Sequence, residues 1–154
     1  MSNELKAPIP RLTVITLGVS DIRASIAFYE ALGFARKFRA TGEAVAFFDT
    51  GGIVLALFPW DQLAQDATLP DHPRPKTFRG STLAWNCGSA EEVETVLAFA
   101  IAKGASMLKP AHSTDYGGYS GYSGYFADPD GHPWEVVVAP GIEVGEDRRV
   151  HLPD

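Results

Sequence analysis

Apolar and polar positions follow two different periods along this chain, and the order of those periods predicts its elements. Residues 11–19, RLTVITLGV, are rich in β-branched side chains and predict a strand. Residues 20–33 follow with apolar side chains at helical spacing, and Gly33 suits the left-handed position that ends a helix. Three short strands are expected next, at 34–40, 44–49 and 53–58.

The same order returns in the second half. Residues 81–87 predict a strand, and residues 89–104 predict a helix that opens with a capping box, in which Ser89 and Glu92 each satisfy the other's backbone N–H. The remaining expected elements are a strand at 106–110, the tyrosine-rich stretch 116–125 as the third strand, and a last strand at 132–138 after the turn DPDG. The chain is therefore predicted to be α+β, with two βαβββ modules in tandem.

The tyrosine-rich stretch, YGGYSGYSGY, belongs to an insertion in the second module. The glycines that end the helices, Gly33 and Gly104, lie 71 residues apart, whereas the last-turn glycines, Gly52 and Gly131, lie 79 apart. The second module therefore has eight additional residues (79 − 71) between its helix and its final turn. A free linker would break the sheet, so we expect a strand with a glycine-rich, looped-out section. A tyrosine spacing of three does not match the strand period of two, so the tyrosines cannot all share one face, and a bulge or turn is expected between them.

These elements suggest a single domain over 1–154. The first module is expected at 11–59 and the second at 81–139. The segment 60–80 between them contains three prolines and reads as a surface linker. The charged tail, 140–154, is either solvated or packs on a partner subunit, and the sequence does not decide between the two.

Composition excludes several classes of function. The 154 residues are 45% apolar, enough for a sizeable core, and carry a formal net charge of −6 with a pI of about 5.1. This charge gives no electrostatic footprint for nucleic acid or an anionic membrane. The single cysteine, Cys87, cannot form an internal disulfide, and the N-terminus lacks the apolar segment of a signal peptide. A cytoplasmic protein is expected.

Two segments resemble a known family. They are ITLGVSDIRASIAFYEALGF (15–34) and GGYSGYSGYFADPDGHPWEVV (117–137), and both are similar to segments of the vicinal oxygen chelate superfamily, which includes glyoxalase I, bleomycin-resistance proteins and extradiol dioxygenases. With the repeat, the resemblance covers about residues 11–139. It implies two βαβββ modules whose curled mixed sheets surround an open cleft, and a homodimer. It also implies that metal-dependent members take His, Glu or Gln ligands from the first and last strands of each module.

The ligand positions implied by this resemblance are mostly filled by residues that do not bind metal. Glu135 falls on the last-strand position of the second module, and the glycine offset places Ala56 at the equivalent position of the first. The first-strand positions fall near Val14 and Thr82. Because one carboxylate cannot hold a catalytic ion alone, we expect no metal cofactor. The alternative is a divalent metal held by Glu135 and unorthodox ligands such as His112, with Asp115 nearby.

A cleft without a metal must bind by shape, stacking and a few hydrogen bonds. Glu135 is the candidate catalytic residue, as a general base or a hydrogen-bond partner of a ligand, although it is equally read as a strand residue satisfied by its neighbours. Strand alternation sends Trp134 to the opposite face. Phe47 and Trp85 are alternatively ordinary core residues. The candidate ligand-binding residues are Phe47, Trp85, His112, Tyr116, Tyr119, Tyr122, Tyr125 and Glu135.

No sequence feature indicates nucleophilic catalysis or nucleotide binding. Cys87 ends an apolar strand and is read as a small core residue. The sequence has no GxSxG, and the glycine-rich tyrosine stretch is not followed by a helix, as a phosphate-binding loop would require.

Three functions remain open. The first is a metal-independent protein that binds a small organic molecule in an aromatic-lined cleft, as bleomycin-resistance proteins do by resemblance. The second is a metal-dependent lyase or isomerase of glyoxalase type, or a dioxygenase, that uses Glu135. The third is a scaffold or protein-interaction module.

Overall fold

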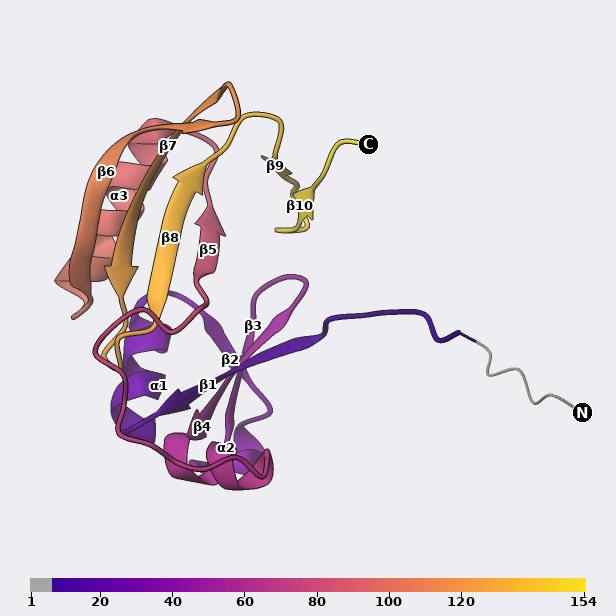
Figure 1. The fold of residues 1–154 in the computed structure, drawn as a ribbon, viewed down its shortest axis with the longest axis vertical. Coiled ribbons are helices and arrows are strands. Elements are labelled where there is room, and N and C mark those ends of the chain that lie inside the picture. Colours follow the sequence, from indigo (N-terminus) through magenta and orange to yellow (C-terminus); the bar gives the residue numbers. More distant parts are fainter. Residues whose placement is uncertain (1–6) are drawn as a thin grey trace, which may run out of the picture.

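The computed structural model describes residues 7–154, except for the side chain of Tyr116. Its N-terminal half forms one four-stranded sheet in the order β1-β4-β3-β2 (Figure 1). β1 and β4 are parallel, and the other neighbours are antiparallel. The elements of this first module are β1 (Val14–Val19), α1 (Ile22–Ala31), β2 (Ala35–Lys37), a 3₁₀ turn (Arg39–Thr41), β3 (Ala46–Asp49) and β4 (Val54–Pro59).

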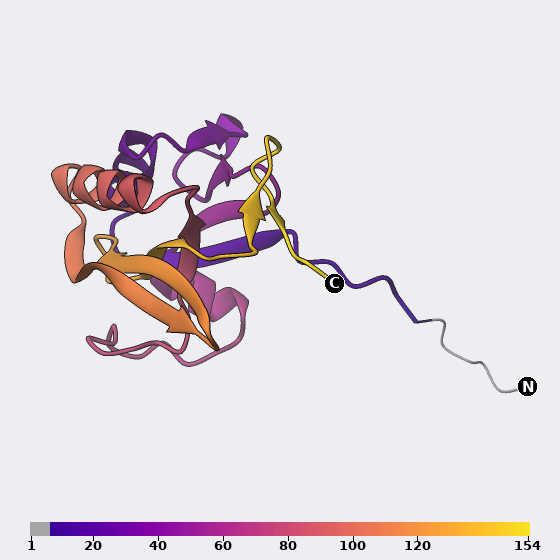
Figure 2. The ribbon, with the colours of Figure 1, turned by 90° about the horizontal axis from the view of Figure 1, so that it is seen from above.

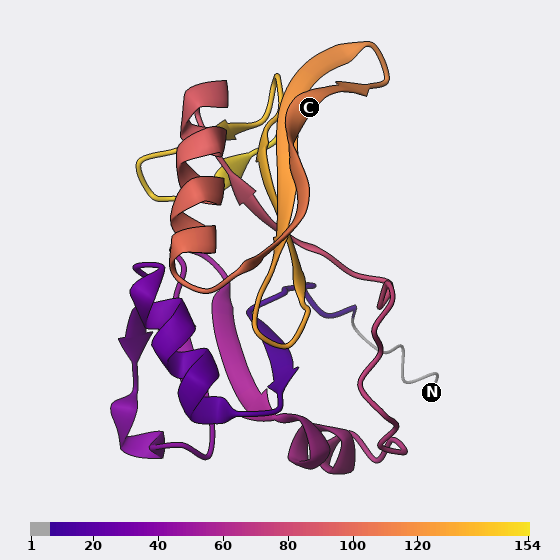
Figure 3. The ribbon, with the colours of Figure 1, turned by 90° about the vertical axis from the view of Figure 1, so that its left-hand side faces the viewer.

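The C-terminal half repeats this arrangement. Its sheet has the order β5-β8-β7-β6, again with the first and last strands parallel. Figure 3 shows α1 and α3 on the same side of the two sheets. The prediction of an α+β fold made of two βαβββ units is confirmed. The elements of this second module are β5 (Leu83–Asn86), α3 (Ala90–Ala102), β6 (Ser106–Tyr116), β7 (Tyr119–Ala127) and β8 (Pro133–Val138).

Two smaller elements lie outside the repeat. α2 (Trp60–Asp66) starts the connection between the modules, and β9 (Glu143–Val144) pairs with β10 (Val150–His151) in a C-terminal hairpin. Figure 2 shows this hairpin beside the first module, whereas residues 7–13 lead away from the body. Within residues 7–154, every helix is too short or too polar to cross a bilayer.

Helix boundaries follow from local chemistry. The Asp21 side chain accepts from Ala24 N at 3.1 Å and begins α1, and Ser89 Oγ accepts from Glu92 N at 3.1 Å and begins α3. The Glu92 carboxylate reaches the N–H of Gly88 rather than that of Ser89, so the expected capping box is shifted by one residue. Gly33 and Gly104 follow the helices with φ of +96° and +109°.

The tyrosine-rich stretch is a hairpin and not a looped-out strand. Gly117 and Gly118 form its turn, both with positive φ, and β7 then runs without a break from Tyr119. This turn lies between Tyr116 and Tyr119, where a bulge or a turn was expected, and β6 has further irregularities on either side of Lys109. The prediction of a looped-out section was wrong because the glycine pair supplies the turn, so the additional residues lengthen both strands. β6 has 11 residues where β2 has three.

Another glycine of this stretch is required by packing. A Cβ on Gly124 would lie 2.6 Å from Leu97 Cδ1 and 2.8 Å from Lys109 O. β7 therefore contacts α3 closely at this position, and only glycine fits there. The apolar side chains of both modules join in one buried cluster that includes Phe48, Leu57, Leu97, Phe126 and Val136.

A buried hydrogen-bond network fastens the second module to α1. Tyr29 is fully buried, and its hydroxyl donates to Asp128 Oδ2 at 2.8 Å and accepts from Trp134 Nε1 at 3.1 Å. Asp128 Oδ1 accepts the backbone N–H groups of Asp130 and His132 at 2.9 and 2.8 Å. Burial raises the pKa of both the Asp128 carboxyl and the Tyr29 hydroxyl, because each charged form would lose its hydration.

The turn that carries Asp128 also docks on the start of α1. Asp130 accepts from Ser20 N at 2.8 Å and from Ser25 Oγ at 3.3 Å. His132 Nε2 lies 2.7 Å from Gly18 O, and its ring stacks on Trp60. The DPDGH segment of the second module is thereby anchored to both ends of the β1–α1 connection.

We predict that Tyr29→Phe lowers the free energy of unfolding by about 1–3 kcal/mol, because it removes the hydroxyl that donates to Asp128 Oδ2 and accepts from Trp134 Nε1 in the buried network. Urea unfolding at neutral pH measures this change. Tyr119→Phe is the matched control, since Tyr119 is 65% exposed; it should change stability by less than about 0.5 kcal/mol. Equal stability of the two variants would contradict the assigned role of this network.

Candidate functional site

The two faces of the second sheet have different roles. Trp134 and Glu135 are consecutive on β8, so their side chains point to opposite faces. Trp134 is buried and contacts Tyr29 and Phe126 on the side of α3. Glu135 is half-buried on the other side, which we call the open face. Its cross-strand neighbours there are Ala84 on β5 and Tyr125 on β7.

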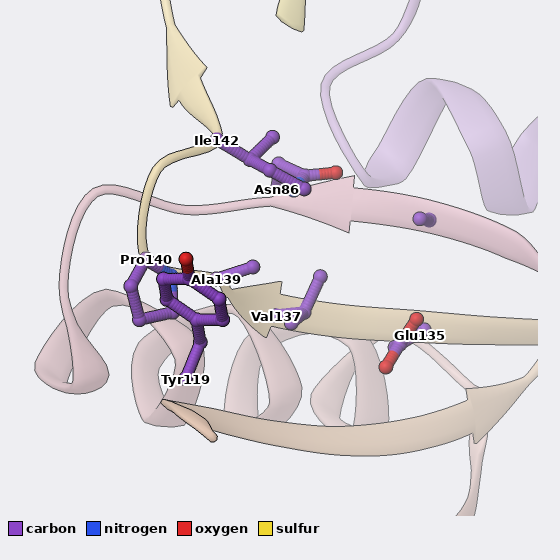
Figure 4. A pocket seen from close by; sticks show the side chains of 8 residues that line it. Asn86, Tyr119, Glu135, Val137, Ala139, Pro140 and Ile142 are labelled. Carbon is purple, nitrogen blue, oxygen red and sulfur yellow. The ribbon is translucent and has the colours of Figure 1, made fainter. Parts of the chain in front are cut away.

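A cavity of about 430 Å³ lies on the open face. Figure 4 shows Tyr119 beside Pro140 at one end of this cavity and Glu135 toward the other end, with Val137 between them. Among the described residues of its lining, Glu135 is the one carboxylate, and the amide of Asn86 adds a second strongly polar group. The residues that line this open-face pocket are Ala84, Asn86, Tyr119, Glu135, Val137, Ala139, Pro140 and Ile142.

The predicted tyrosines are divided between the two faces. Tyr119 lines the open-face pocket, and Tyr125 shares the open face with Glu135 in register. Tyr122 lies on the side of α3, where its hydroxyl donates to Glu94 Oε1 at 2.5 Å, and this hydrogen bond raises the tyrosine's pKa. The side chain of Tyr116 lies outside the part that the structure describes.

The unorthodox metal ligands are not brought together. His112 on β6 pairs with Ser123 on β7, so a whole strand separates it from Glu135 on β8. Two strand spacings correspond to roughly 9–10 Å, too far for a shared ion. Asp115 Oδ1 accepts from Gly118 N at 2.7 Å within the hairpin turn. Over residues 7–154, no cluster of three His, Cys, Asp or Glu side chains could hold a metal.

Phe47 and Trp85 lie away from the open-face pocket. Trp85 pairs with Val136 on the side of α3 and contacts Phe34 edge to face, with ring centroids 5.4 Å apart. Phe47 is half-buried in the first module, where it stacks on Phe38 at 6.0 Å. Neither residue lines the pocket beside Glu135.

The strand register permits a direct test of the ligand positions that the family would use. Ala84 is the neighbour of Glu135, and Thr16 is the neighbour of Ala56, so the strand pairing of both modules agrees with the match of Ala56 to Glu135. The first module therefore has Ala56 at the position where the second module has the carboxylate of Glu135. With Val14 and Thr82 on the first strands, the donor set does not fit a resident divalent ion.

Sequence comparison identifies the family. The model of the Glyoxalase/Bleomycin resistance protein/Dioxygenase superfamily matches residues 11–136. The chain belongs to this superfamily. A glyoxalase-related enzyme from Fulvimarina pelagi is 34% identical over 95% of this chain and 100% of its own, with a TM-score of 0.81.

Other members of the superfamily show how far the likeness extends. A family enzyme from Burkholderia phytofirmans covers 84% of this chain and 98% of its own with a TM-score of 0.69, but at 23% identity this likeness concerns the fold alone. A protein of Mycolicibacterium smegmatis described as uncharacterized is 38% identical over 82 residues, which are 53% of this chain and 62% of that protein. The chain thus matches less than two thirds of that relative's length.

Several residues of the open-face pocket were not predicted from the sequence. Val137 follows from Glu135 by the strand period of two, and Asn86 is its neighbour on β5. Both could therefore have been found from the predicted strands. Pro140 and Ile142 were assigned to the charged tail, and nothing in their sequence shows that the chain turns back toward the sheet after β8.

We predict that Cys87 does not react as a nucleophile in this member of the superfamily. The side chain is buried, and burial raises the pKa of its thiol to about 12. In the folded protein at pH 8, Ellman's reagent should modify only a small fraction of the thiol within an hour. The unfolded protein in guanidinium should react fully, and it serves as the control. Rapid stoichiometric labelling of the folded protein would contradict this expectation.

Proposed function

We propose that this protein binds a small organic molecule in the open-face pocket without a metal ion. The observation that carries the proposal is the pair of matched positions on the two modules, with Ala56 where the second module has Glu135. The family's metal chemistry needs several ligands that converge on one ion. A single carboxylate in an otherwise largely apolar pocket supports a different use, in which Glu135 accepts a hydrogen bond from a ligand.

The lining suggests the chemistry of that ligand. Val137, Ala139 and Ile142 supply an apolar wall, and Tyr119 adds an aromatic ring at one end. Glu135 and Asn86 supply the polar contacts. This combination suits a compact, partly apolar molecule that carries an amine or a hydroxyl group. The net charge of −6 favours a cationic ligand over an anionic one at this pocket.

A second candidate is an enzyme of glyoxalase or dioxygenase type. It is favoured by the relative from Fulvimarina pelagi, which is described as a glyoxalase-related enzyme and is similar over nearly the whole chain. Glu135 would then act as the general base or as one ligand of a divalent ion. The separation of His112 from Glu135 by a full strand weighs against this alternative.

We also propose that the protein works as a cytoplasmic homodimer. The single buried cysteine and the absence of any possible internal disulfide support a reducing compartment. The dimer rests on the resemblance to the superfamily. Sedimentation of the purified protein would test it.

We predict that the purified, untagged protein retains less than about a tenth of an equivalent of metal after incubation with Mn, Fe, Co, Ni or Zn and desalting. The lining of the open-face pocket offers too few donors to retain an ion. Elemental analysis by mass spectrometry measures the retained metal. About one equivalent of one metal, lost in Glu135→Ala, would instead establish the enzyme alternative.

We predict that compounds which raise the melting temperature in a ligand screen bind at Glu135. Glu135→Gln should remove most of the thermal shift, because the neutral amide no longer offers a charged acceptor, and Tyr119→Ala should reduce it. Tyr122→Phe is the matched control, since Tyr122 belongs to β7, as Tyr119 does, but lies on the opposite face of the sheet. A shift that survives in Glu135→Gln and Tyr119→Ala would place the ligand elsewhere.

A further inference from the structure

A second and larger cavity, of about 930 Å³, lies between the two modules. Its floor contains the rings of Phe34, Trp85 and Trp134, and we call it the intermodule cleft. It meets the open-face pocket only along Ala84 and Asn86 of the edge strand β5. Trp134, which lines the cleft, and Glu135, which lines the open-face pocket, point to opposite faces of β8.

The C-terminal hairpin forms one wall of this cleft through Val144, Arg148, Arg149 and Val150. From the sequence, the tail was expected to be either solvated or packed on a partner subunit. In the structure the tail is largely exposed, and its hairpin contacts the chain's own first module through Asp49 and Gly51. It rests on the turn between β3 and β4. A Cβ on Gly51 would lie only 2.7 Å from Arg148 Cβ, so the glycine permits this close contact.

Two hydrogen bonds from consecutive arginines hold the hairpin to that turn. Arg148 Nη2 lies 3.3 Å from Asp49 Oδ1, and Arg149 Nε donates to Gly51 O at 3.3 Å. The first contact pairs two opposite charges, whereas the second uses a neutral carbonyl. The Arg148 guanidinium is therefore already paired with a carboxylate, whereas the Arg149 guanidinium is not.

Four charged side chains line the described part of the cleft, two carboxylates and two guanidinium groups, and they differ in their partners. Asp49 accepts from Gly51 N at 2.8 Å as well as from Arg148, and Glu92 accepts from Gly88 N at 2.6 Å. Both acids thus have partners. Of the two arginines in the lining, Arg148 pairs with Asp49, whereas the Arg149 guanidinium donates, among the described residues, only to the Gly51 carbonyl through Nε, so its Nη groups retain donors for an anion.

We propose that the intermodule cleft binds a small aromatic carboxylate. The carboxylate lies on the guanidinium of Arg149, and the aromatic ring packs on Trp85 and Phe34. A guanidinium and a carboxylate form a charge-assisted, bidentate contact, and stacking on aromatic rings adds to it. A cavity of this size falls within the range of small-molecule sites. The proposal concerns a different cavity and the opposite ligand charge from the site at Glu135.

The test is isothermal titration of the full chain with 1-naphthaleneacetate and with its amide, 1-naphthaleneacetamide, which has nearly the same shape and no charge. The acid should bind at least about tenfold more tightly than the amide, because only the acid forms a charge-assisted bond. Arg149→Gln should weaken the binding of the acid by a similar factor and leave the affinity for the amide unchanged. Arg23→Gln is the matched control, since Arg23 is an exposed arginine that pairs with Glu43 outside this cleft.

The comparison of acid and amide on the unaltered protein keeps the test valid even if Arg149→Gln folds poorly, which a melting curve would reveal. Equal affinity for the two compounds would overturn the proposal. So would binding of the acid that is lost in Glu135→Gln and kept in Arg149→Gln, which would place it in the open-face pocket. Absence of binding heat at millimolar concentrations of the acid would overturn it as well. A failure of the function proposed for Glu135 would change none of the expected results for Arg149.

Discussion

The hydrogen bonds of the Tyr29 hydroxyl connect the two halves of this protein. Tyr29 belongs to α1 of the first module, and its partners Asp128 and Trp134 belong to the last turn and last strand of the second. An unsatisfied carboxylate or indole at this depth would destabilise the fold by more than most single contacts stabilise it. The network therefore works as a constraint on geometry, because the modules have few other arrangements in which all three polar groups find partners.

Both cavities depend on this constraint. When Trp134 is fixed against Tyr29 and Phe34, the alternation of β8 directs Glu135 to the opposite face. Trp134 also lines the intermodule cleft, where the C-terminal hairpin contacts the β3–β4 turn. The strand β8 thus contributes the ring of Trp134 to the intermodule cleft and the carboxylate of Glu135 to the open-face pocket. The same two residues of β5, Ala84 and Asn86, border both cavities.

Sequence patterns predicted the order of the elements well, because each depends on neighbours along the chain. The periods of apolar residues, the caps at Asp21 and Ser89 and the glycines at 33 and 104 are all local signals. The candidate site was harder to predict. The placement of Glu135 and Tyr125 follows from strand register, but the entry of Pro140 and Ile142 into the pocket depends on a reversal of the chain after β8. Such tertiary contacts do not produce a periodic pattern in the sequence.

The tyrosine-rich stretch shows why composition alone is a poor guide to function. Its Tyr-Ser-Gly repeat has a period of three, and a strand has a period of two, so successive tyrosines alternate between faces. Tyr119 and Tyr125 lie on the open face, whereas Tyr122 lies on the side of α3 and its hydroxyl donates to Glu94. Gly124 is fixed by the closeness of Leu97, which is a requirement of packing. The repeat therefore combines a turn, a helix contact and a pocket wall in one hairpin, and only two of its tyrosines with described side chains are in a position to meet a ligand.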